Sequence, residues 1–208
     1  MDTFGLVDPP DARPTWNAAP TQELPVVRAM SDGRKLNNLR WGLVPPWSKD
    51  LAIGSRMINA RSETAAEKPS FREALRCRRC LIVADGFYEW QRDGDHKRPF
   101  CIHLRDRRPF GMGGLWETWS DENEQAVETF TILTTSPNSL LSPIHDRMPV
   151  IIPADQHDRW LAHDLQDPGQ VACLMVPYPD DEMEAYEVTS RVNSPRNNDE
   201  ACLMPANE

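Results

Sequence analysis

The sequence contains no apolar run that approaches the roughly 18 residues needed to span a membrane, so we expect no membrane-embedded segment. Its first residues, Met1 to Gly5, hold no basic cluster followed by an apolar stretch and therefore do not predict a signal peptide. The 5 cysteines are few and odd in number. Without an export signal, we expect them to be reduced thiols in a cytoplasmic protein.

Proline, in contrast, is abundant, with 19 among the 208 residues. Because proline interrupts helices and central strands, this content argues against a helical bundle and predicts short elements joined by many turns. With 39% hydrophobic and 26% charged residues, the chain can bury one sizeable core. We therefore expect a single domain over residues 1–208.

The formal net charge of -9 hides two segments of opposite sign. Residues 28–108 carry 18 Lys and Arg against 10 Asp and Glu, a net charge of +8, whereas residues 109–208 carry 4 against 18, a net charge of -14. Ligands respond to the local field rather than to the total charge. The basic segment is compatible with a polyanionic partner; the alternative is a solvated surface of mixed charge.

Short apolar segments bounded by turn residues predict a mostly β protein. Strands are expected over residues 24–30, 39–44, 81–84, 99–104, 110–119, 129–135 and 148–152, and residues 171–176 are expected to form a strand or a buried segment. Helical turns are expected over residues 62–66, after a capping box at 70–73, and over 154–163 with Asp155 as cap. Closely spaced short strands favour an α+β fold on a barrel-like, mainly antiparallel sheet with a few flanking short helices.

Residues 59–64 (Asn-Ala-Arg-Ser-Glu-Thr) concentrate an amide, a guanidinium, two hydroxyls and a carboxylate. At a helix start, backbone N–H groups and Arg61 would face an anion such as a phosphate. The alternative is structural, with Ser62 capping the helix and Arg61 paired with Glu63 or Glu67.

Residues 85–90 (Asp-Gly-Phe-Tyr-Glu-Trp) place one carboxylate among three aromatic side chains. In an extended segment, Phe87 and Glu89 face one way, and Tyr88 and Trp90 face the other. A partly desolvated carboxylate beside an aromatic ring has a raised proton affinity, which suits general acid–base chemistry. A glutamate held in a salt bridge on an edge strand is the alternative.

His145 lies in a loop flanked by proline, just before an expected strand. A rigidly held histidine can donate or accept a proton near neutral pH, and Asp146 or Arg147 could orient it. The other four histidines have no such neighbourhood, although a lone histidine is also common as a structural residue.

Two further patterns have both structural and functional interpretations. Cys77 and Cys80 form a CxxC pair, but no second ligand pair follows at zinc spacing, so buried structural thiols are expected and no metal is predicted. Trp41 and Trp47 bracket a Pro-Pro step, which gives rigid aromatics for base stacking or, alternatively, core filling.

Together, in this order, seven segments resemble the SOS-response-associated peptidase family, also called abasic-site processing proteins. The segments are Trp16–Gln22, Arg40–Trp47, Asn59–Thr64, Ala84–Trp90, Thr131–Thr135, His145–Pro149 and Val192-Asn193. The resemblance runs from about residue 16 to about residue 195.

The resemblance implies a function in the DNA damage response. It implies a basic groove that binds single-stranded DNA containing an abasic site, without metal or cofactor, by a monomer associated with the nucleoid. Family members crosslink reversibly to the sugar through an N-terminal cysteine exposed when the initiator methionine is removed. Its α-amine forms a Schiff base and its thiol closes a thiazolidine; the same cysteine is held responsible for peptidase-like self-processing.

The resemblance also implies roles for individual residues. Three would be catalytic: Asn59 positions the N-terminal residue and the sugar, Glu89 moves protons at the amine, and His145 donates a proton that helps open the sugar. DNA binding would use Arg61 on a flanking phosphate, Trp47 and Pro20 against bases, Thr134 in the pocket, and Trp41 beside them.

The chain departs from the family pattern at its start. The family begins Met-Cys-Gly-Arg, whereas this sequence begins Met1-Asp2-Thr3-Phe4, and its first cysteine is Cys77. Two explanations are open: the true start lies upstream, with Phe4-Gly5-Leu6 belonging to the end of a helix that follows the cysteine strand, or the nucleophile has been lost. In both cases we expect the chain as written to form no thiazolidine. Two alternatives remain: a non-catalytic single-stranded DNA binder, and a thiol hydrolase that pairs an internal cysteine such as Cys101 with His145.

Overall fold

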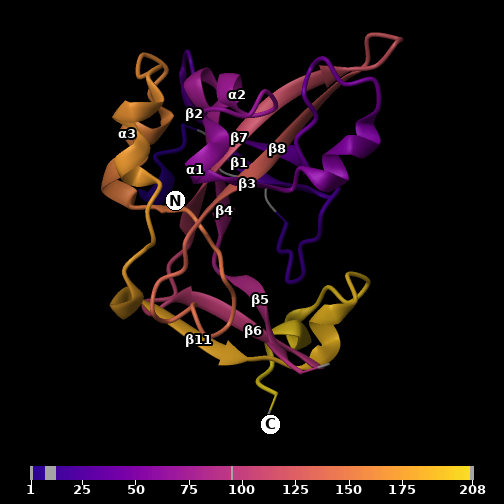
Figure 1. Ribbon diagram of the computed structural model, residues 1–208, viewed down its shortest axis with the longest axis vertical. Helices are drawn as coiled ribbons and strands as arrows, with labels where there is room; N and C mark the ends of the chain where they lie inside the picture. The colour runs from indigo at the N-terminus through magenta and orange to yellow at the C-terminus, as the bar shows by residue number, and fades with distance from the viewer. Residues whose placement is uncertain (1, 8–12, 95, 207–208) are drawn as a thin grey trace.

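The computed structural model describes residues 2–7, 13–94 and 96–206, in which a barrel-like sheet stands above a smaller sheet (Figure 1). The strands are β1 (Glu23–Met30), β2 (Gly33–Trp41), β3 (Asn59–Arg61), β4 (Arg79–Ala84), β5 (Phe87–Asp93), β6 (His96–Leu104), β7 (Phe110–Ser120), β8 (Ala126–Thr135), β9 (Met148–Pro149), β10 (Ile151–Ile152) and β11 (Met183–Glu187). The α-helices are α1 (Ser62–Ala65), α2 (Arg72–Cys77) and α3 (His157–Leu161). Short 3₁₀ helices are η1 (Asp2–Phe4), η2 (Leu51–Arg56), η3 (Ala154–Gln156), η4 (Pro168–Gln170), η5 (Ala172–Leu174), η6 (Asp180–Glu182), η7 (Ser190–Asn193) and η8 (Glu200–Leu203).

Five strands close the main sheet into a barrel in the order β7-β4-β1-β2-β8, because β8 pairs with β7 as well as with β2. Neighbours are antiparallel except β2 and β8, which run parallel. The β1–β2 hairpin turns at Gly33, whose φ of +122° lies in the region that favours glycine. The expected α+β fold on a barrel-like sheet is confirmed.

Both faces of the barrel wall are buried over most of β4 and β7 and in the second half of β8, which explains why these stretches are rich in apolar residues, whereas β2 buries only Leu39. Val26 packs in the barrel interior with Phe130, whereas the adjacent Val27 packs under the outer layer. That outer layer includes Leu75 from α2 and Trp160 from α3, and the Trp160 indole N–H donates to the Cys80 carbonyl at 2.8 Å. The helices are therefore a cover over the sheet.

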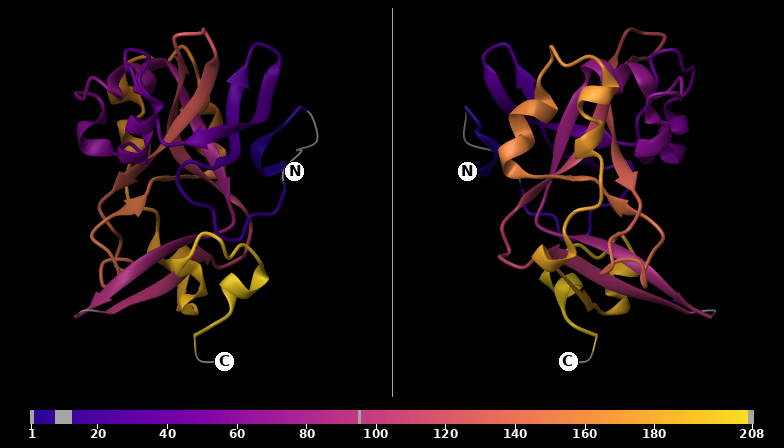
Figure 2. Two further views of the ribbon diagram at one scale, coloured as in Figure 1. Left: turned by 90° about the vertical axis from the view of Figure 1, so that its right-hand side faces the viewer. Right: turned by 60° about the vertical axis from the view of Figure 1, so that its left-hand side comes forward.

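The second sheet has the order β11-β6-β5 and is antiparallel throughout. Its inner face, with Phe87 and Ile102, packs against the barrel core. Its outer face, with Tyr88 and Cys101, packs against Val192 and other residues of the C-terminal segment. The β5–β6 hairpin extends beyond the barrel (Figure 2).

Several sequence-based boundaries are wrong. The strand expected over residues 39–44 runs instead from Gly33 to Trp41. It begins earlier because the tight turn between β1 and β2 lets the two strands pair from Met30 and Gly33 onward. The capping box at residues 70–73 does not form: α2 begins at Arg72 after Phe71, and no side chain caps it.

Further along the chain, Asp155 does not cap a helix, because the helix begins as η3 after Pro153 with no side-chain cap bond. Residues 171–176 form neither a strand nor a fully buried segment: η5 lies in the middle, Val171 and Leu174 are buried, and Cys173 and Val176 are exposed. Strand β11 was not predicted by its sequence pattern; it pairs with β6 over Met183 to Glu187.

The N-terminal residues behave as a short helical turn that closes on the barrel. Helix η1 ends at Phe4, Gly5 follows with φ +59°, and Leu6 then forms a parallel bridge with Arg34. Phe4 is buried and its ring stacks on His157 of α3 at 5.4 Å between centroids. Residues 4–6 therefore lie at the end of a short 3₁₀ turn, while the cysteine strand that would precede it stays a prediction. The extended lead-in that proline predicts for residues 8–14 lies mostly outside the described residues.

Helices in the described part of the chain are all short. None is both long enough and apolar enough to cross a membrane.

Candidate functional site

Three strands bring distant polar segments to one end of the barrel. Strand β3 runs parallel to the end of β8, which sets Asn59 opposite Ile132 and Arg61 opposite Thr134. The next residues of β8 pair with β9, so the loop that carries His145 enters directly beside them. On β3, Asn59 and Arg61 are exposed while Ala60 between them is buried, so both polar side chains share the solvent face.

Glu63 pairs with Arg147 and not with Arg61, contrary to the structural alternative considered from the sequence. The Arg147 guanidinium donates to the two Glu63 oxygens at 2.7 and 2.8 Å and to the Thr134 carbonyl at 2.5 Å. Arg147 holds the pKa of Glu63 below its ordinary value, mainly through this hydrogen bonding. Sequence reasoning gave Arg147 only a possible part in orienting His145 and missed this link.

Arg61 itself is the N-terminal flanking residue of the single-turn helix α1, and Ser62 does not cap it. Within the described residues Arg61 has no ion-pair partner. Arg61 is exposed and available to an external anion; its role in binding a phosphate stays a prediction.

Glu89 projects from β5 toward the barrel side of the small sheet. It lies opposite Phe100, whose ring packs on the barrel core, and its side chain is only 21% exposed. Gln91, on the same face, donates from its amide to the Pro143 carbonyl at 2.9 Å and so joins β5 to the loop that carries His145. Nothing in the sequence pattern singled out Gln91.

The Glu89 carboxylate and the His145 imidazole meet at this junction, with 4.0 Å between Oε2 and Nδ1. Burial raises the pKa of Glu89, and the nearby His145 opposes that rise. A carboxyl with a raised pKa beside an imidazole is a typical acid–base pair. Glu89 lies on a strand of the small sheet and His145 in the loop between β8 and β9 of the main sheet, so the packing of the small sheet against the barrel brings them together.

The His145 ring is 41% exposed. Its Nδ1 lies 3.1 Å from the Arg147 N–H and 3.2 Å from the Arg147 carbonyl, and only one of these bonds can exist at a time. The neutral ring that accepts the N–H carries its proton on Nε2. The protonated ring can turn its Nδ1–H toward the carbonyl or toward Asp146 at 3.3 Å. The geometry therefore suits a group that exchanges a proton.

The candidate base-stacking residues lie in different environments. Trp47 is 60% exposed on the loop after β2, and the Trp119 indole holds that loop by donating to the Ser48 carbonyl at 2.7 Å. Trp41 is half-buried, with its ring stacked on Phe130. Pro20 is exposed in a turn that is tied to β2 by backbone bonding. Only Trp47 and Pro20 offer open surface.

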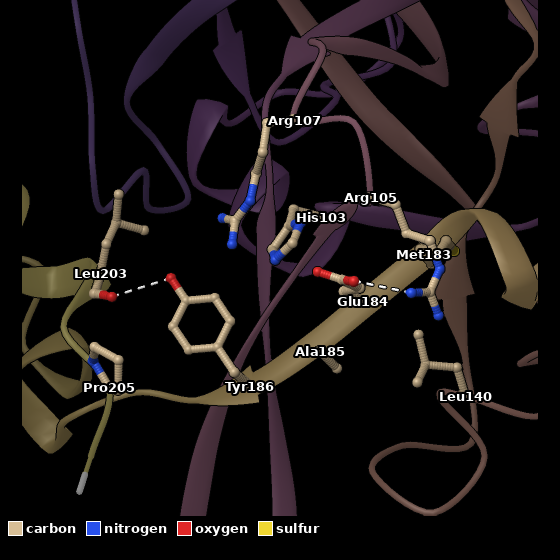
Figure 3. A pocket seen from close by; sticks show the side chains of 10 residues that line it. All are labelled: His103, Arg105, Arg107, Leu140, Met183, Glu184, Ala185, Tyr186, Leu203 and Pro205. Carbon is tan, nitrogen blue, oxygen red and sulfur yellow. Dashed lines mark hydrogen bonds and ion pairs between the residues drawn. The ribbon is translucent and has the colours of Figure 1, made fainter. Parts of the chain in front are cut away.

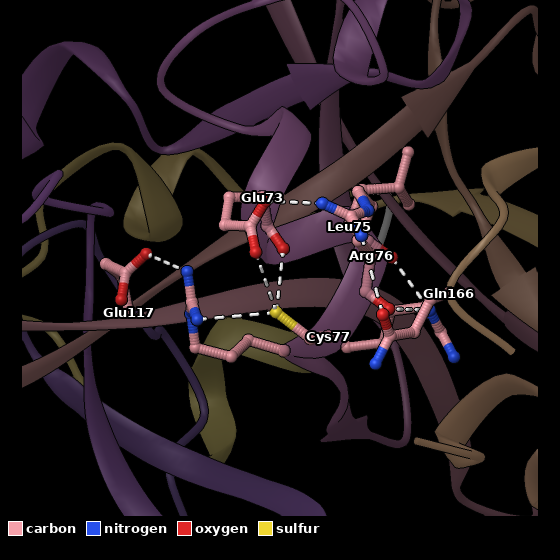
Figure 4. A network of polar contacts seen from close by, with 8 residues as sticks. Glu73, Leu75, Arg76, Cys77, Glu117 and Gln166 are labelled. Atoms are coloured by element: carbon pink, nitrogen blue, oxygen red, sulfur yellow. Dashed lines mark hydrogen bonds and ion pairs between the residues drawn. The ribbon is translucent and has the colours of Figure 1, made fainter. Parts of the chain in front are cut away.

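The surroundings of the CxxC pair, Cys77 and Cys80, indicate a structural role. Cys77 ends α2 and its Sγ lies 3.1 Å from the Glu73 carbonyl oxygen, next to the Arg78–Glu117 ion pair (Figure 4). Burial raises the pKa of Cys77, which disfavours the thiolate. Within the described residues, no cluster of three or more His, Cys, Asp or Glu side chains could hold a metal ion.

Cys101 and His145 are not arranged as a nucleophile and its base. The Cys101 side chain faces the C-terminal segment with Tyr88, on the opposite side of the small sheet from Glu89. Burial also raises the pKa of the Cys101 thiol. The thiol-hydrolase alternative built on this pair therefore has no support in the geometry.

A comparison with models of protein families shows which family the chain belongs to. The model of the SOS response associated peptidase (SRAP) family matches residues 2–195. The chain belongs to the SRAP family. The resemblance seen in the sequence motifs is thus confirmed.

Relatives of this SRAP chain occur in bacteria and in vertebrates. It is 47% identical over 186 residues to "Abasic site processing protein YoqW" of Bacillus subtilis, covering 89% of this chain and 83% of the relative. It is 32% identical over 241 aligned positions to "Abasic site processing protein HMCES" of Mus musculus, covering 96% and 67%. A crystal structure of a Bacteroides thetaiotaomicron protein is similar with a TM-score of 0.82 and 31% identity, covering 89% of this chain and 82% of that one.

Proposed function

We propose that this SRAP chain binds single-stranded DNA at an abasic site, and that Glu89 and His145 move the protons of a covalent reaction at the opened sugar. The approach of these two groups to 4.0 Å, with burial raising the pKa of Glu89, carries the proposal. The curated relatives named as abasic site processing proteins support the choice of substrate.

The binding part of the proposal rests on two exposed side chains. Arg61, which has no ion-pair partner among the described residues, binds a phosphate beside the lesion. Trp47 stacks on a neighbouring base, Pro20 wedges against another, and Thr134 lines the site of the sugar. The half-buried Trp41 supports this surface from below.

The covalent part follows the chemistry that the family resemblance implies. The α-amine of an N-terminal cysteine adds to the aldehyde carbon of the open sugar and loses water to give an imine. The thiol then adds to the imine carbon, and its proton passes to the nitrogen as the thiazolidine closes. His145 protonates the sugar oxygen as the ring opens, Glu89 relays the amine protons, and Asn59 positions both partners.

The sequence as given has no cysteine before Cys77. We therefore propose binding and proton transfer for the 208-residue chain, and thiazolidine formation for the chain preceded by Met-Cys-Gly-Arg. Reversal of the link and peptidase-like self-processing belong to the same proposal, since both would use that cysteine. In the cell, we propose a monomer on nucleoid DNA, acting without metal or cofactor.

A denaturing gel with an abasic single-stranded oligonucleotide tests the reaction. We expect a crosslinked band from the extended chain and none from the 208-residue chain. In the extended chain, Glu89→Gln and His145→Gln should lower the rate of crosslink formation by about 10²- to 10⁴-fold. Glu67→Gln, on the exposed surface, should leave that rate unchanged. A band from the 208-residue chain, or none from the extended one, contradicts the proposal.

A second candidate is a non-catalytic single-stranded DNA-binding module. The availability of Arg61 and Trp47 favours it, because neither contact needs a nucleophile. This candidate predicts salt-dependent binding without a crosslink even in the extended chain. It also predicts that Glu89→Gln leaves the function intact.

A further inference from the structure

A second site lies away from Glu89 and His145. An open pocket of about 620 Å³ is lined by strands β6 and β11 of the small sheet, the turn after β6, the C-terminal segment and Leu140 of the loop that precedes β9 (Figure 3). The lining residues that carry polar chemistry are His103, Arg105, Arg107, Glu184 and Tyr186. Glu184 lies opposite His103 in the β6–β11 register, and both point to the face opposite to that of Glu89. The volume is in the range of small-molecule sites.

His103 presents a buried nitrogen that has no partner. Its ring is 2% exposed, and its Nδ1 lies 2.8 Å from the Leu104 carbonyl. Because a carbonyl only accepts, Nδ1 carries the proton and Nε2 of the neutral ring is an acceptor. Within the described residues Nε2 has no hydrogen-bond partner, and Figure 3 shows the ring directed into the pocket. A buried acceptor without a donor is costly, which points to a ligand group that supplies one.

Arg107 presents a guanidinium without a carboxylate partner. Its neighbours Arg105 and Arg108 pair with Glu184 and with Asp106, respectively, whereas Arg107 has no ion pair among the described residues. Its guanidinium carbon lies 5.8 Å from the centre of the Tyr186 ring, at the pocket. The planar fork of arginine matches a phosphate or a carboxylate.

The remaining walls complete a mixed surface. The Tyr186 hydroxyl donates to the Leu203 carbonyl at 3.0 Å, which fixes the ring as one wall. The Glu184 carboxylate adds a second acceptor near His103 while it pairs with Arg105 at 2.9 Å. Two acceptors and one available cation fit a ligand that carries several hydroxyl donors and one anionic group.

We propose that this pocket binds a sugar phosphate, with the phosphate on Arg107 and a sugar hydroxyl donating to His103 Nε2. The same chemistry occurs in a free sugar phosphate or nucleotide and in the phosphorylated end of a DNA strand. The site is on the opposite face of the small sheet from Glu89, so it is separate from the proposed abasic-site chemistry and does not depend on it.

Calorimetric titration of the 208-residue protein tests the proposal with two ligands, ribose 5-phosphate and a 5′-phosphorylated single-stranded oligonucleotide. The main variant is Arg107→Asn, since Arg107 has φ +57° and asparagine tolerates that conformation. We expect about tenfold weaker binding, which is the loss typical of one charge-assisted hydrogen bond. The matched control is Arg196→Asn, an exposed arginine in a loop, which should bind as the unchanged protein does.

A second measurement follows His103 directly. The ring ¹⁵N signal of Nε2 should shift when ribose 5-phosphate binds, and His103→Phe should weaken binding if the variant folds. Binding of the oligonucleotide alone, still sensitive to Arg107→Asn, identifies a DNA end as the source of the phosphate and supports the proposal. No binding of either ligand at millimolar concentration, or binding that Arg107→Asn leaves unchanged, overturns it.

Discussion

Glu63 and Arg147 are 84 residues apart in the sequence, yet their side chains form two parallel hydrogen bonds of 2.7 and 2.8 Å. Arg147 also donates to the Thr134 carbonyl, so one guanidinium connects α1, the end of β8 and the loop of His145. Because Glu63 is engaged in this way, Arg61 on the preceding strand keeps no internal partner among the described residues. One ion pair thus connects the segments of the site and leaves Arg61 available to an external anion.

Glu63→Gln should destabilise the fold modestly at neutral pH. Arg147 lowers the pKa of Glu63, so the pair stabilises the protein above the ordinary pKa of 4.5, and that stability is lost as the pH falls through the lowered value. Glu63 is 50% exposed, so we expect a loss of only about 0.5–1 kcal/mol. Urea denaturation at pH 7 and at pH 3 measures it, with Glu67→Gln as control. An equal loss at both pH values would contradict the ion-pair explanation.

Glu89→Gln should have the opposite effect on stability. Burial raises the pKa of Glu89 above 4.5, so its contribution is most favourable below that pH and declines as the pH rises through the raised value. The uncharged amide avoids this cost. We expect a higher Tm than that of the unchanged protein at pH 7 and little difference below about pH 4.

Glu187→Gln is a matched control on the same small sheet. Arg98 lowers the pKa of Glu187, so this substitution should lower the Tm at pH 7. Thermal melts at both pH values measure the two variants together. A lower Tm for Glu89→Gln at pH 7 would show that the Glu89 carboxylate stabilises the fold. It would contradict the idea that this carboxylate lowers stability for the sake of function.

Trp47→Ala should weaken single-stranded DNA binding with little change in stability. The ring is 60% exposed, and loss of stacking on a base typically costs about 1–3 kcal/mol of binding free energy. Fluorescence anisotropy with an oligonucleotide measures the loss.

Trp41→Phe is the contrasting variant. It removes the indole N–H that donates to the Ile58 carbonyl at 2.9 Å, in a ring that stacks on Phe130. We expect it to lower stability by about 1–3 kcal/mol and to change DNA binding less than Trp47→Ala does. The reverse order of binding effects would assign the stacking surface to Trp41.

Asn17→Ala should destabilise the protein strongly. The buried Asn17 amide nitrogen lies within 3.0–3.2 Å of three carbonyl oxygens in the C-terminal segment, those of Val192, Ser194 and Asn197. Loss of this amide leaves buried acceptors unpaired, at a cost of about 2–3 kcal/mol. Urea denaturation measures it, and the exposed Asn123→Ala serves as control. An equal effect of the two substitutions would mean that the segments are joined by other contacts.

Sequence alone determined the features that depend on near neighbours. The turn at Ser31 to Gly33 and the alternation of Phe87 and Glu89 against Tyr88 follow from backbone freedom and from the period of a strand. The order of the motifs was enough to identify the family. The turn and the alternation hold because each rests on residues a few positions apart.

Tertiary structure decided everything that required a choice of partner. The sequence allows local ion pairs of Arg61 with Glu63 or Glu67. In the structure β3 pairs in parallel with β8, and Glu63 forms its ion pair with Arg147 instead. The meeting of Glu89 with His145 likewise depends on two sheets packing together. Side-chain pairing is set by distance in space, and a sequence of charges contains no information on which distant strands will lie side by side.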